Sequence, residues 1–513
     1  MKKYLWLFLS LGFLLITCKK SDDLVVNQVQ EESTEEPKEG VNITVQDFMW
    51  QALNLWYFYQ GDVPDLADDR FSLQSEYDEY LSQNPDPEEF LNNKLLFSED
   101  RFTFYSDNYK DLTNFLAGIF KSNGMEFFLT RPPEGGNKVI GVVRYIIKDS
   151  DAASKDLQRG DIFYAVNGVE LIAETDAQGF IISSNLELLD PDSYTLNMAD
   201  IVDNVTVPNN KEITLTKQEG LEEDPILLHN VLEIGDKKIG YLMYNIFTAG
   251  SGERLNEVFV DFKTAGVTDL VLDLRYNGGG RGSTATILAS LIYGPNTDDL
   301  FFKTRYNDKL QAIFDPSEYN FVSTTGSLDG NMNTPLSSLN LNKLYVLATS
   351  RSASASELVM VGLEPYLDIV HIGTTTVGKN QGSVTLVDDY DSGFQYSPER
   401  EDNINPGNQW GLQPLVSKVE NAAGFSDYSD GLFPDIELKE DVLNLGILGD
   451  RNEPLLAMAI QEITGISAKR SFDVQLPAEV IMDSKMFYPF ENSLILDNLP
   501  TSLIKNINSK LKK

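Results

Sequence analysis

The chain has 513 residues, 42% of them hydrophobic and 11% aromatic, which is an ordinary globular composition with room for two to four domains. Its 78 acidic and 41 basic residues leave a formal net charge of −37, which argues against nucleic acid or anionic lipid headgroups as partners. One cysteine and two histidines exclude a disulfide framework and leave little for a zinc site.

The N-terminus has the pattern of an export signal. Met1-Lys2-Lys3 is a short basic start, Tyr4 through Thr17 is almost wholly apolar, and Cys18 follows. This run is too short to span a bilayer but fits the apolar region of a signal peptide. Residues 1–18 therefore resemble a bacterial lipoprotein signal that ends at a lipidated Cys18. We expect an exported bacterial lipoprotein at the outer membrane, on its periplasmic face or at the cell surface.

The next two segments differ in pattern. Residues 19–44 are charged, free of aromatic side chains and without periodicity, so we expect a flexible tether. Residues 45–118 are predicted to form an N-terminal helical domain. Apolar residues near Trp50 recur at i, i+3, i+4 and i+7, and Asp86-Pro87 has the form of a helix start.

Residues 119–220 have the pattern of a small β-rich domain. A strand is expected to begin at Gly124-Met125-Glu126-Phe127. Ser150 to Gly168 then gives a short helix, a Gly-Asp turn, an apolar strand and an Asn-Gly turn. That order resembles a PDZ domain, which implies that a peptide end adds as a strand beside Gly124, Met125, Glu126 and Phe127, with its carboxylate on nearby amides. A β domain that serves only as a spacer is the alternative.

Strands and helices alternate across residues 221–467, as in an α/β domain. We expect strands at 239–246, 269–275 and 344–348 and a helix at 252–265. Two long segments, about 296–342 and 388–428, interrupt this pattern and are expected to shape a cleft. Residues 468–513 form a C-terminal extension to which the sequence assigns no function.

A stretch of small residues, Ser352-Ala-Ser-Ala-Ser-Glu357, joins the strand at 344–348 to an apolar, helix-like run. At such a junction a serine hydroxyl stands clear of the backbone, beside helix N-terminal amides that stabilise an oxyanion. The base is the next question, because two histidines allow few Ser-His-Asp sets. His229 lies between two candidate domains, and His371 alternates with apolar residues like part of a buried strand.

Lys379 lies 25 positions after Ser354, among neutral residues. The pKa of a lysine, about 10.4 in water, must fall by roughly 3 before the amine accepts a proton near pH 7. Burial produces such a change, and the neutral neighbours are compatible with burial. Serine plus lysine is therefore the hypothesis for the catalytic pair.

These motifs occur in the order and approximate spacing of the carboxyl-terminal processing (tail-specific) peptidases. The resemblance covers residues 45–467 and rests on Asp273-Leu-Arg275-Tyr-Asn277-Gly-Gly-Gly280, the serine stretch, Gly378-Lys379, and Tyr428 to Ile436. It implies an α/β multi-domain fold with an N-terminal helical segment, a PDZ-like β-rich domain and an α/β (ClpP/crotonase-like) serine peptidase core.

The resemblance also implies roles for individual residues. Ser354 is the implied nucleophile, ahead of its rivals Ser352 and Ser356, and Lys379 is the implied general base. The oxyanion hole would be the amide of Ala355 with that of Gly279 or Gly278. Glu357 is interpreted as a structural, helix-start residue. No metal or cofactor is implied.

Two positions depart from the family pattern. Many relatives have a glutamine shortly after the lysine that orients it, whereas here Gln381 and Thr385 both remain candidates for a third member. Some relatives carry an aspartate where this chain has Pro365.

The stretch from Gly373 to Lys379 nearly matches the motif of a phosphate-binding loop. Asn380, however, occupies the position at which that motif needs a Ser or Thr to bind magnesium.

The predicted function is a membrane-anchored serine endopeptidase that recognises the free C-terminal tails of protein or peptide substrates. A non-catalytic peptide-binding surface lipoprotein is the alternative, and an esterase or amidase with the same pair is a third possibility.

Overall fold

The computed structural model describes residues 42–176, 181–294, 296–326, 333–466, 480–487, 494–496, 498–499, 503–504 and 507. The expected signal peptide with Cys18, nearly all of the expected tether and most of the C-terminal extension lie outside these residues. Within the described ranges, no helix combines the length and apolar character needed to cross a bilayer. The α/β multi-domain class with an N-terminal helical segment is confirmed.

The N-terminal segment is built from short helices around α1 (Thr44–Trp56), whose buried face includes Phe48, Met49 and Trp56. Asp86 caps the N-terminus of helix α3 (Pro87–Phe90) by accepting the backbone amides of Glu88 and Glu89, as the Asp86-Pro87 pair in the sequence indicates. The other elements are η1 (Gln60–Asp62), η2 (Pro64–Leu66), α2 (Gln74–Ser82), α3 (Pro87–Phe90), η3 (Leu91–Leu95), β1 (Phe104–Ser106) and α4 (Tyr109–Leu116).

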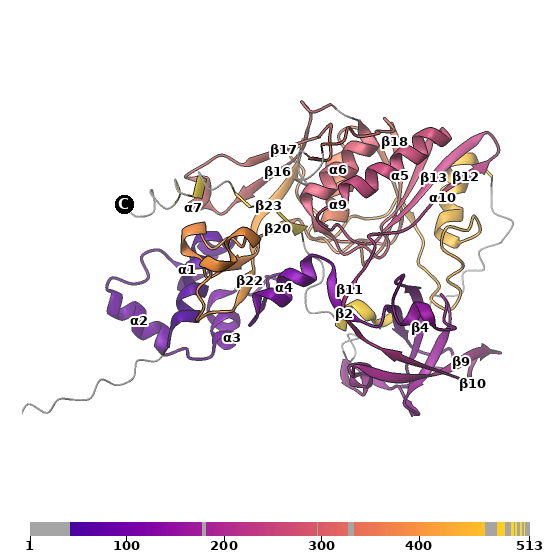
Figure 1. Cartoon of the computed structure of the whole chain (residues 1–513), viewed down its shortest axis with the longest axis horizontal. Coiled ribbons are helices and arrows are strands. Elements are labelled where there is room, and N and C mark those ends of the chain that lie inside the picture. The colour runs from indigo at the N-terminus through magenta and orange to yellow at the C-terminus, as the bar shows by residue number, and fades with distance from the viewer. Residues whose placement is uncertain are drawn as a thin grey trace, which may run out of the picture. The chain divides into compact units, whose positions relative to one another are not determined.

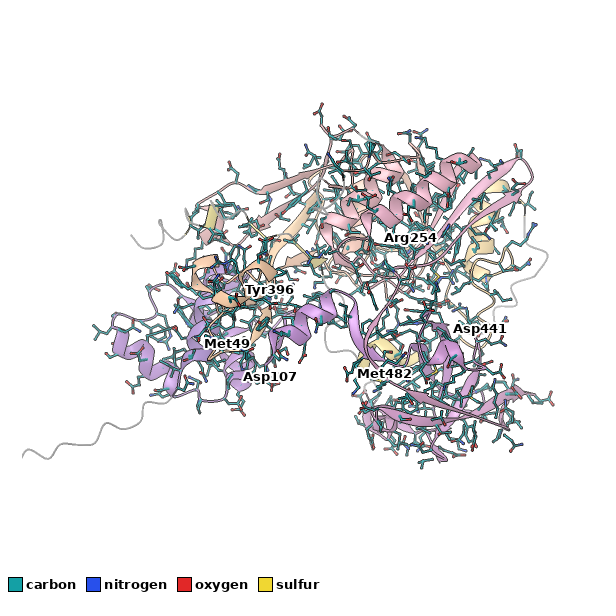
Figure 2. All side chains as sticks on the ribbon, viewed as in Figure 1. Met49, Asp107, Arg254, Tyr396, Asp441 and Met482 are labelled. Atoms are coloured by element: carbon teal, nitrogen blue, oxygen red, sulfur yellow. The ribbon has the colours of Figure 1, made fainter. Side chains whose placement is uncertain are left out.

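The β-rich domain is one sheet in the order β10-β9-β5-β4-β3-β25, with β6 beside β5. The expected Asn-Gly turn follows β5, with positive φ at Asn167 and Gly168, and the expected short helix is a single 3₁₀ turn. Met482 of β25, from far along the chain, lies against this domain (Figure 2). The strands are β3 (Met125–Thr130), β4 (Ile140–Ile146), β5 (Ile162–Val166), β6 (Val169–Glu170), β9 (Ser193–Val202), β10 (Val205–Thr216) and β25 (Val480–Asp483).

Smaller elements flank this sheet. They are β2 (Ile119–Ser122) paired with β11 (Gln218–Glu222), β7 (Ala173–Thr175) paired with β8 (Ile181–Ser184), η4 (Ala152–Ser154), η5 (Leu186–Leu189) and η8 (Ser484–Phe487).

The α/β core has a sheet in the order β12-β13-β14-β18-β19-β24, parallel except for β12. Helices α5, α6 and α9 lie together (Figure 1), and their apolar side chains share one buried cluster with Leu270 and Leu272 of β14. Val271 of the same strand points the other way, into a cluster with α10. The elements are β12 (Ile226–Ile234), β13 (Lys237–Tyr244), β14 (Asp269–Asp273), β18 (Lys343–Ala348), β19 (Asp368–Gly373), β24 (Ile436–Glu437), α5 (Gly252–Ala265), α6 (Gly282–Tyr293), α9 (Ala355–Leu363) and α10 (Pro454–Thr464).

The two expected interruptions contribute strands. Strand β16 from the first pairs with β23 from the second, and β22 of the second pairs with β1 of the N-terminal segment. Strand β23 follows β22 closely in the chain and also pairs with β20, which begins two residues after Lys379. The N-terminal segment is therefore connected, through β22 and β23, to the chain just after Lys379. These elements are β15 (Gly280–Arg281), β16 (Leu300–Tyr306), α7 (Asp308–Gln311), β17 (Ser317–Asn320), β20 (Gln381–Ser383), β21 (Leu386–Val387), η6 (Tyr390–Ser392), η7 (Pro398–Asn403), β22 (Gly411–Gln413), β23 (Leu415–Asn421) and β26 (Leu494–Ile495).

Candidate active site

Ser354 lies between the end of β18 and the first residue of α9, in a backbone conformation that side chains rarely adopt. Its φ is 62° and its ψ is −112°. Such a conformation is strained for a residue other than glycine, and strain of this kind concentrates at functional sites. The Ser354 hydroxyl is buried and has no hydrogen-bond partner among the described residues.

The two rival serines are held by the backbone. The hydroxyl of Ser352 donates to the carbonyl of Leu274 over 2.8 Å, and that of Ser356 donates to the carbonyl of Asn277 over 2.9 Å. Both bonds tie the serine stretch to the loop after β14. Of the three hydroxyls, only that of Ser354 is uncommitted, which favours it as the nucleophile.

Glu357 joins the serine stretch to the lysine. One carboxylate oxygen accepts the amides of Ser354 (2.7 Å) and Lys379 (2.9 Å). The other accepts the amide of Gly378 (2.7 Å) and the hydroxyl of Thr376 (2.5 Å). Burial raises the pKa of Glu357, but four donors on four lone-pair positions favour the ionised carboxylate. The sequence predicted a structural role for Glu357, and the residue sets where the serine and lysine backbones lie relative to each other.

Lys379 is fully buried, and its amine has no hydrogen-bond partner among the described residues. Burial lowers the pKa of Lys379 from 10.5 to about 7, while the charges of Asp100 and Glu357 oppose the change. Its position depends on Gly378, where φ is 86° and a Cβ would lie 2.2 Å from the carbonyl oxygen of Ser429. Because its pKa is lowered to about 7, a substantial part of the Lys379 amine is neutral near pH 7, as a general base requires.

An aromatic ring from the N-terminal segment lies beside the Lys379 amine. The ring centroid of Phe102, a partly exposed residue, lies 5.2 Å from the lysine amine. Arg101 beside it donates to the carbonyl of Ser429 over 3.0 Å, which ties the segment before β1 to the loop that packs on Gly378.

Substitution of Phe102 by alanine is expected to raise the pKa of Lys379. Water would then reach the amine and stabilise its charged form. The ring's own attraction for the ammonium, about 0.5–2 kcal/mol, is smaller than the desolvation that moves the pKa from 10.5 to about 7. The acidic limb of the pH–rate profile should therefore move to higher pH. An unchanged limb in a folded variant would contradict the role of Phe102, and Phe115→Ala in α4 is the matched control.

The amides expected to form the oxyanion hole differ in their availability. The amide of Gly279 donates to the side chain of Asn277 over 2.9 Å. The amides of Gly278 and Ala355 make no hydrogen bond to any described residue. The carbonyl of Asn277 accepts the amide of Ala353 over 3.2 Å, so the glycine run lies against the serine stretch. Gly278 and Ala355 are thus the two candidate amides that are ready to donate.

Neither candidate for the third member is hydrogen-bonded to Lys379. The hydroxyl of Thr385 donates to Gln413 over 2.7 Å. The amide nitrogen of Gln381 donates to the hydroxyl of Tyr59 over 3.0 Å, while its buried oxygen has no partner among the described residues. Of the two, Gln381 is the one that has a buried acceptor atom left without a partner among the described residues.

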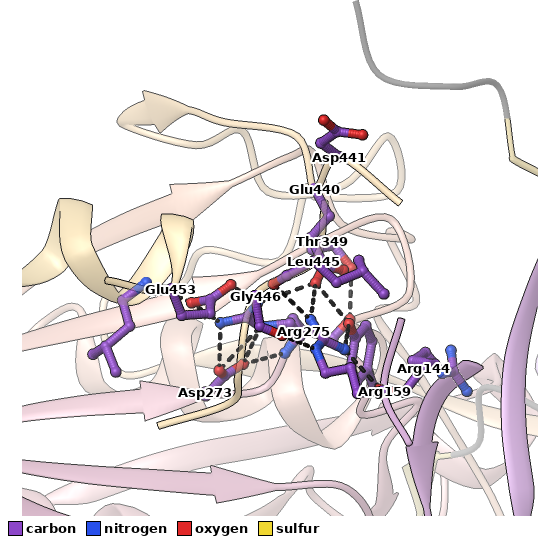
Figure 3. A network of polar contacts seen from close by, with 12 residues as sticks. Arg144, Arg159, Asp273, Arg275, Thr349, Glu440, Asp441, Leu445, Gly446 and Glu453 are labelled. Carbon is purple, nitrogen blue, oxygen red and sulfur yellow. Dashed lines mark hydrogen bonds and ion pairs between the residues drawn. The ribbon is translucent and has the colours of Figure 1, made fainter. Parts of the chain in front are cut away.

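The remaining motifs are structural. Arg275 is completely buried and binds Asp273, Glu453 and Glu440, and Glu440 also pairs with Arg159 of the β-rich domain (Figure 3). The carbonyl of Arg275 accepts the hydroxyl of Thr349, just before the serine stretch, over 2.6 Å. His371 is buried in β19, with one ring nitrogen 3.1 Å from the carbonyl of Ala348. No cluster that could hold a metal ion occurs in the described part of the chain.

The expected peptide-binding strand is β3, and its outer edge is already paired. Strand β25 lies antiparallel beside it. Met125 and Phe127 point into the core of the β-rich domain, and Glu126 is buried in an ion pair with Arg144 at 2.9 Å.

Comparison with known proteins matches two parts of the chain. Residues 238–417 match peptidase family S41, and residues 44–104 match the peptidase S41 N-terminal domain. The chain thus carries a peptidase S41 domain and a peptidase S41 N-terminal domain. The longer S41 match contains Ser354 and Lys379, and the shorter one contains Phe102. The β-rich domain lies between the two.

Two relatives illustrate the S41 resemblance. The carboxyl-terminal-processing peptidase 1, chloroplastic, of Arabidopsis thaliana is 24% identical over 301 residues, which are 57% of this chain and 54% of that protein. The match thus spans about half the length of that curated relative. A crystal structure of a putative S41 protease from Bacteroides fragilis is 26% identical, with a TM-score of 0.62, and the alignment covers 82% of this chain and 97% of that one.

Sequence reasoning missed three residues of this S41 site. Phe102 and Asp100 lie in a segment interpreted only as helical core. Tyr428 was noted only within a motif, and its buried hydroxyl has no partner among the described residues. Burial, together with the charge of Glu357, holds the pKa of Tyr428 above its usual range. No local pattern marks Phe102 or Asp100, because their role depends on the pairing of β1 with β22.

Proposed function

We propose that the chain is a serine endopeptidase that cleaves proteins and peptides by means of Ser354 and Lys379. The observation that carries this proposal is a fully buried lysine with a pKa of about 7, joined through Glu357 to a strained serine with an uncommitted hydroxyl. A buried lysine without a hydrogen-bonded acid is costly to the fold, so a catalytic use explains it better than a structural one.

In the first half-reaction the neutral amine of Lys379 removes the proton of the Ser354 hydroxyl as its oxygen attacks the peptide carbonyl. The carbonyl oxygen becomes an oxyanion, which the amides of Ala355 and Gly278 would stabilise as hydrogen-bond donors. Lys379 then gives its proton to the leaving amine, and an acyl-enzyme ester on Ser354 remains.

In the second half-reaction a water molecule takes the place of the leaving amine of the substrate. Lys379 takes a proton from the water as its oxygen attacks the ester carbonyl, and then returns that proton to the Ser354 oxygen. The carboxylic acid product leaves, and both side chains regain their starting states. The third member of the site would be Gln381, which follows Lys379 by two residues and whose buried side-chain oxygen is unpaired among the described residues.

The substrate and the location follow from the sequence. A PDZ-like domain that precedes an S41 core suits recognition of free C-terminal tails by strand addition to β3. The signal-like residues 1–18 with Cys18 support a lipid-anchored protein of the bacterial outer membrane. Lipid on Cys18 would be detected by mass spectrometry of the mature N-terminal peptide.

The test is hydrolysis of an unstructured protein by wild type and by Ser354→Ala. The variant is expected to lose at least about 10³-fold in kcat/KM, because no other hydroxyl can take the place of the nucleophile. In the wild type, kcat/KM should rise with pH through an apparent pKa of about 7 and then level off, since only the neutral lysine accepts the serine proton.

The matched controls are Ser352→Ala and Ser356→Ala, which remove hydroxyls bonded to the backbone and should keep the pH profile. Turnover retained in Ser354→Ala would refute the proposal.

A peptide-binding role without catalysis is the second candidate, because Ser354 and Lys379 are both 0% exposed in this structure. A serine-directed fluorophosphonate separates the two functions. The peptidase should be labelled at Ser354, whereas a binding protein should not be labelled there.

A further inference from the structure

The chain supplies its own strand to the edge at which a substrate tail is expected. Strand β25 (Val480–Asp483) pairs antiparallel with β3, with Val480 opposite Thr130, Met482 opposite Leu129 and Asp483 opposite Phe128. Strand addition to a sheet edge is the way in which PDZ domains bind peptides. The segment therefore occupies the position of a ligand.

The direction of the segment is also that of a ligand. Because the pairing is antiparallel, β25 runs toward Gly124, at the start of β3, where the carboxylate of a tail was expected. There the hydroxyl of Ser484 accepts the amide of Phe127 over 3.0 Å and donates to Glu126 over 2.5 Å. The polar groups at this end of β3 are thus bound by residues of the same chain.

The segment also contacts the serine stretch. The Asp483 carboxylate is fully buried, lies 3.5 Å from Arg144, and forms an ion pair with Arg351. Arg351 stands three residues before Ser354. Lys485 donates to the carbonyl of Tyr276, in the loop before the glycine run, over 3.3 Å. One short segment therefore bridges the β-rich domain and both loops of the candidate site.

Room for an incoming chain end lies beside this segment. A cavity of about 410 Å³ is lined by Asn123, Met125, Phe127 and Ser484, among other residues. A substrate tail that enters there would meet the β3 edge at the end where β25 stops.

We propose that residues 480–484 are an internal ligand of the PDZ-like domain, which substrate tails must displace and whose displacement releases Asp483 from Arg351 beside the serine stretch. This inference rests on the proposed peptidase function for its effect on turnover, but not for its effect on binding. The segment and the groove belong to one chain, so the competitor is present at a high effective concentration. The apparent affinity for a tail is the intrinsic affinity multiplied by the fraction of molecules in which the groove is open.

A reversible covalent lock tests the proposal. Thr130 and Val480 are direct cross-strand partners, so the double variant Thr130→Cys/Val480→Cys places two thiols within disulfide reach. In the chain from residue 19 onward, which keeps the whole compact unit that begins at Ile43, no other cysteine is present. Oxidation and reduction then compare the locked and unlocked groove in one protein.

The probe is a short, unstructured, fluorescent peptide with an apolar C-terminal residue and a free carboxylate, beside its C-terminally amidated twin. The reduced protein is expected to bind the free-carboxylate peptide, and the oxidised protein to bind it at least about tenfold more weakly. Hydrolysis of a tailed protein substrate should fall in parallel and return on reduction. Single-cysteine variants control for the substitutions themselves.

Equal binding of the peptide by the oxidised and reduced forms would overturn the inference. Failure of the proposed function looks different, since the reduced protein would then bind the peptide without hydrolysing it or reacting at Ser354 with a fluorophosphonate.

A second variant loosens the segment without a disulfide. Asp483→Asn removes the charge that faces Arg144 and Arg351 and keeps the side-chain shape, so the groove should open more often. The apparent Kd for the free-carboxylate peptide is expected to fall several-fold, whereas Asp156→Asn, an exposed acid of the same domain, should leave it unchanged. A Kd that stays the same in Asp483→Asn would contradict the role of the ion pair.

Discussion

Replacement of Lys379 by methionine is expected to abolish peptide hydrolysis and at the same time to stabilise the fold. Methionine fills a similar volume but accepts no proton, so kcat/KM should fall by about 10²- to 10⁴-fold, the usual contribution of a general base. Activity at wild-type level would show that Lys379 is not the base.

The gain in stability follows from the pKa of Lys379. Burial lowers that pKa from 10.5 to about 7, so between these values the unfolded chain holds a proton that the folded chain releases. The wild-type free energy of unfolding therefore rises with pH across this window. At pH 7 the penalty amounts to about 4 kcal/mol, and methionine removes it.

Urea denaturation at pH 7 and at pH 10 measures this effect. The difference between Lys379→Met and wild type should shrink as the pH rises, and Lys263→Met on the exposed face of α5 controls for the loss of one positive charge. A variant less stable than wild type at pH 7 would contradict the buried, neutral lysine described above.

Replacement of Glu357 by glutamine is expected to damage both stability and activity. The carboxylate accepts four hydrogen bonds, and an amide in its place presents N–H groups to two of the same donors. Hydrogen bonds to a charged group contribute about 1.5–3 kcal/mol each, so a loss of roughly 3–5 kcal/mol is expected. Chemical denaturation measures it.

Activity should suffer more than stability alone requires. The same carboxylate oxygen holds the amides of Ser354 and Lys379, and small displacements of reacting groups cost about 10²-fold in rate. Glu364→Gln at the exposed end of α9 is the matched control. A folded Glu357→Gln variant with normal kcat/KM would show that this link does not position the pair.

Much of the architecture could be predicted because it depends on short-range patterns of the sequence. The expected helix at 252–265 has the bounds of α5, and the apolar strand expected between the Gly-Asp and Asn-Gly turns is β5. Period-2 and period-3.6 patterns, Gly-Asp and Asn-Gly turns and a proline at a helix start are local signals. The family match at residues 238–417 also confirms the resemblance read from the spaced motifs.

The candidate site was predictable only where its residues lie in such motifs. Ser354 and Lys379 stand in small-residue and glycine turns whose geometry the sequence encodes. Phe102 and Asp100 do not, because they reach the lysine through the pairing of β1 with β22, which no local pattern specifies. The pairing of β25 with β3 is equally remote in sequence, so the C-terminal extension received no function from its sequence.

The position of Phe102 over Lys379 has a consequence for the life of the newly made chain. The amine is neutral near pH 7 only while the surrounding residues exclude water, and part of that enclosure comes from the N-terminal segment. An incompletely folded molecule, in which this segment has not yet docked through β1, holds its lysine as a hydrated ammonium ion. Such a molecule has a nucleophile without a base, so a folding intermediate cannot hydrolyse peptides until the N-terminal segment has docked.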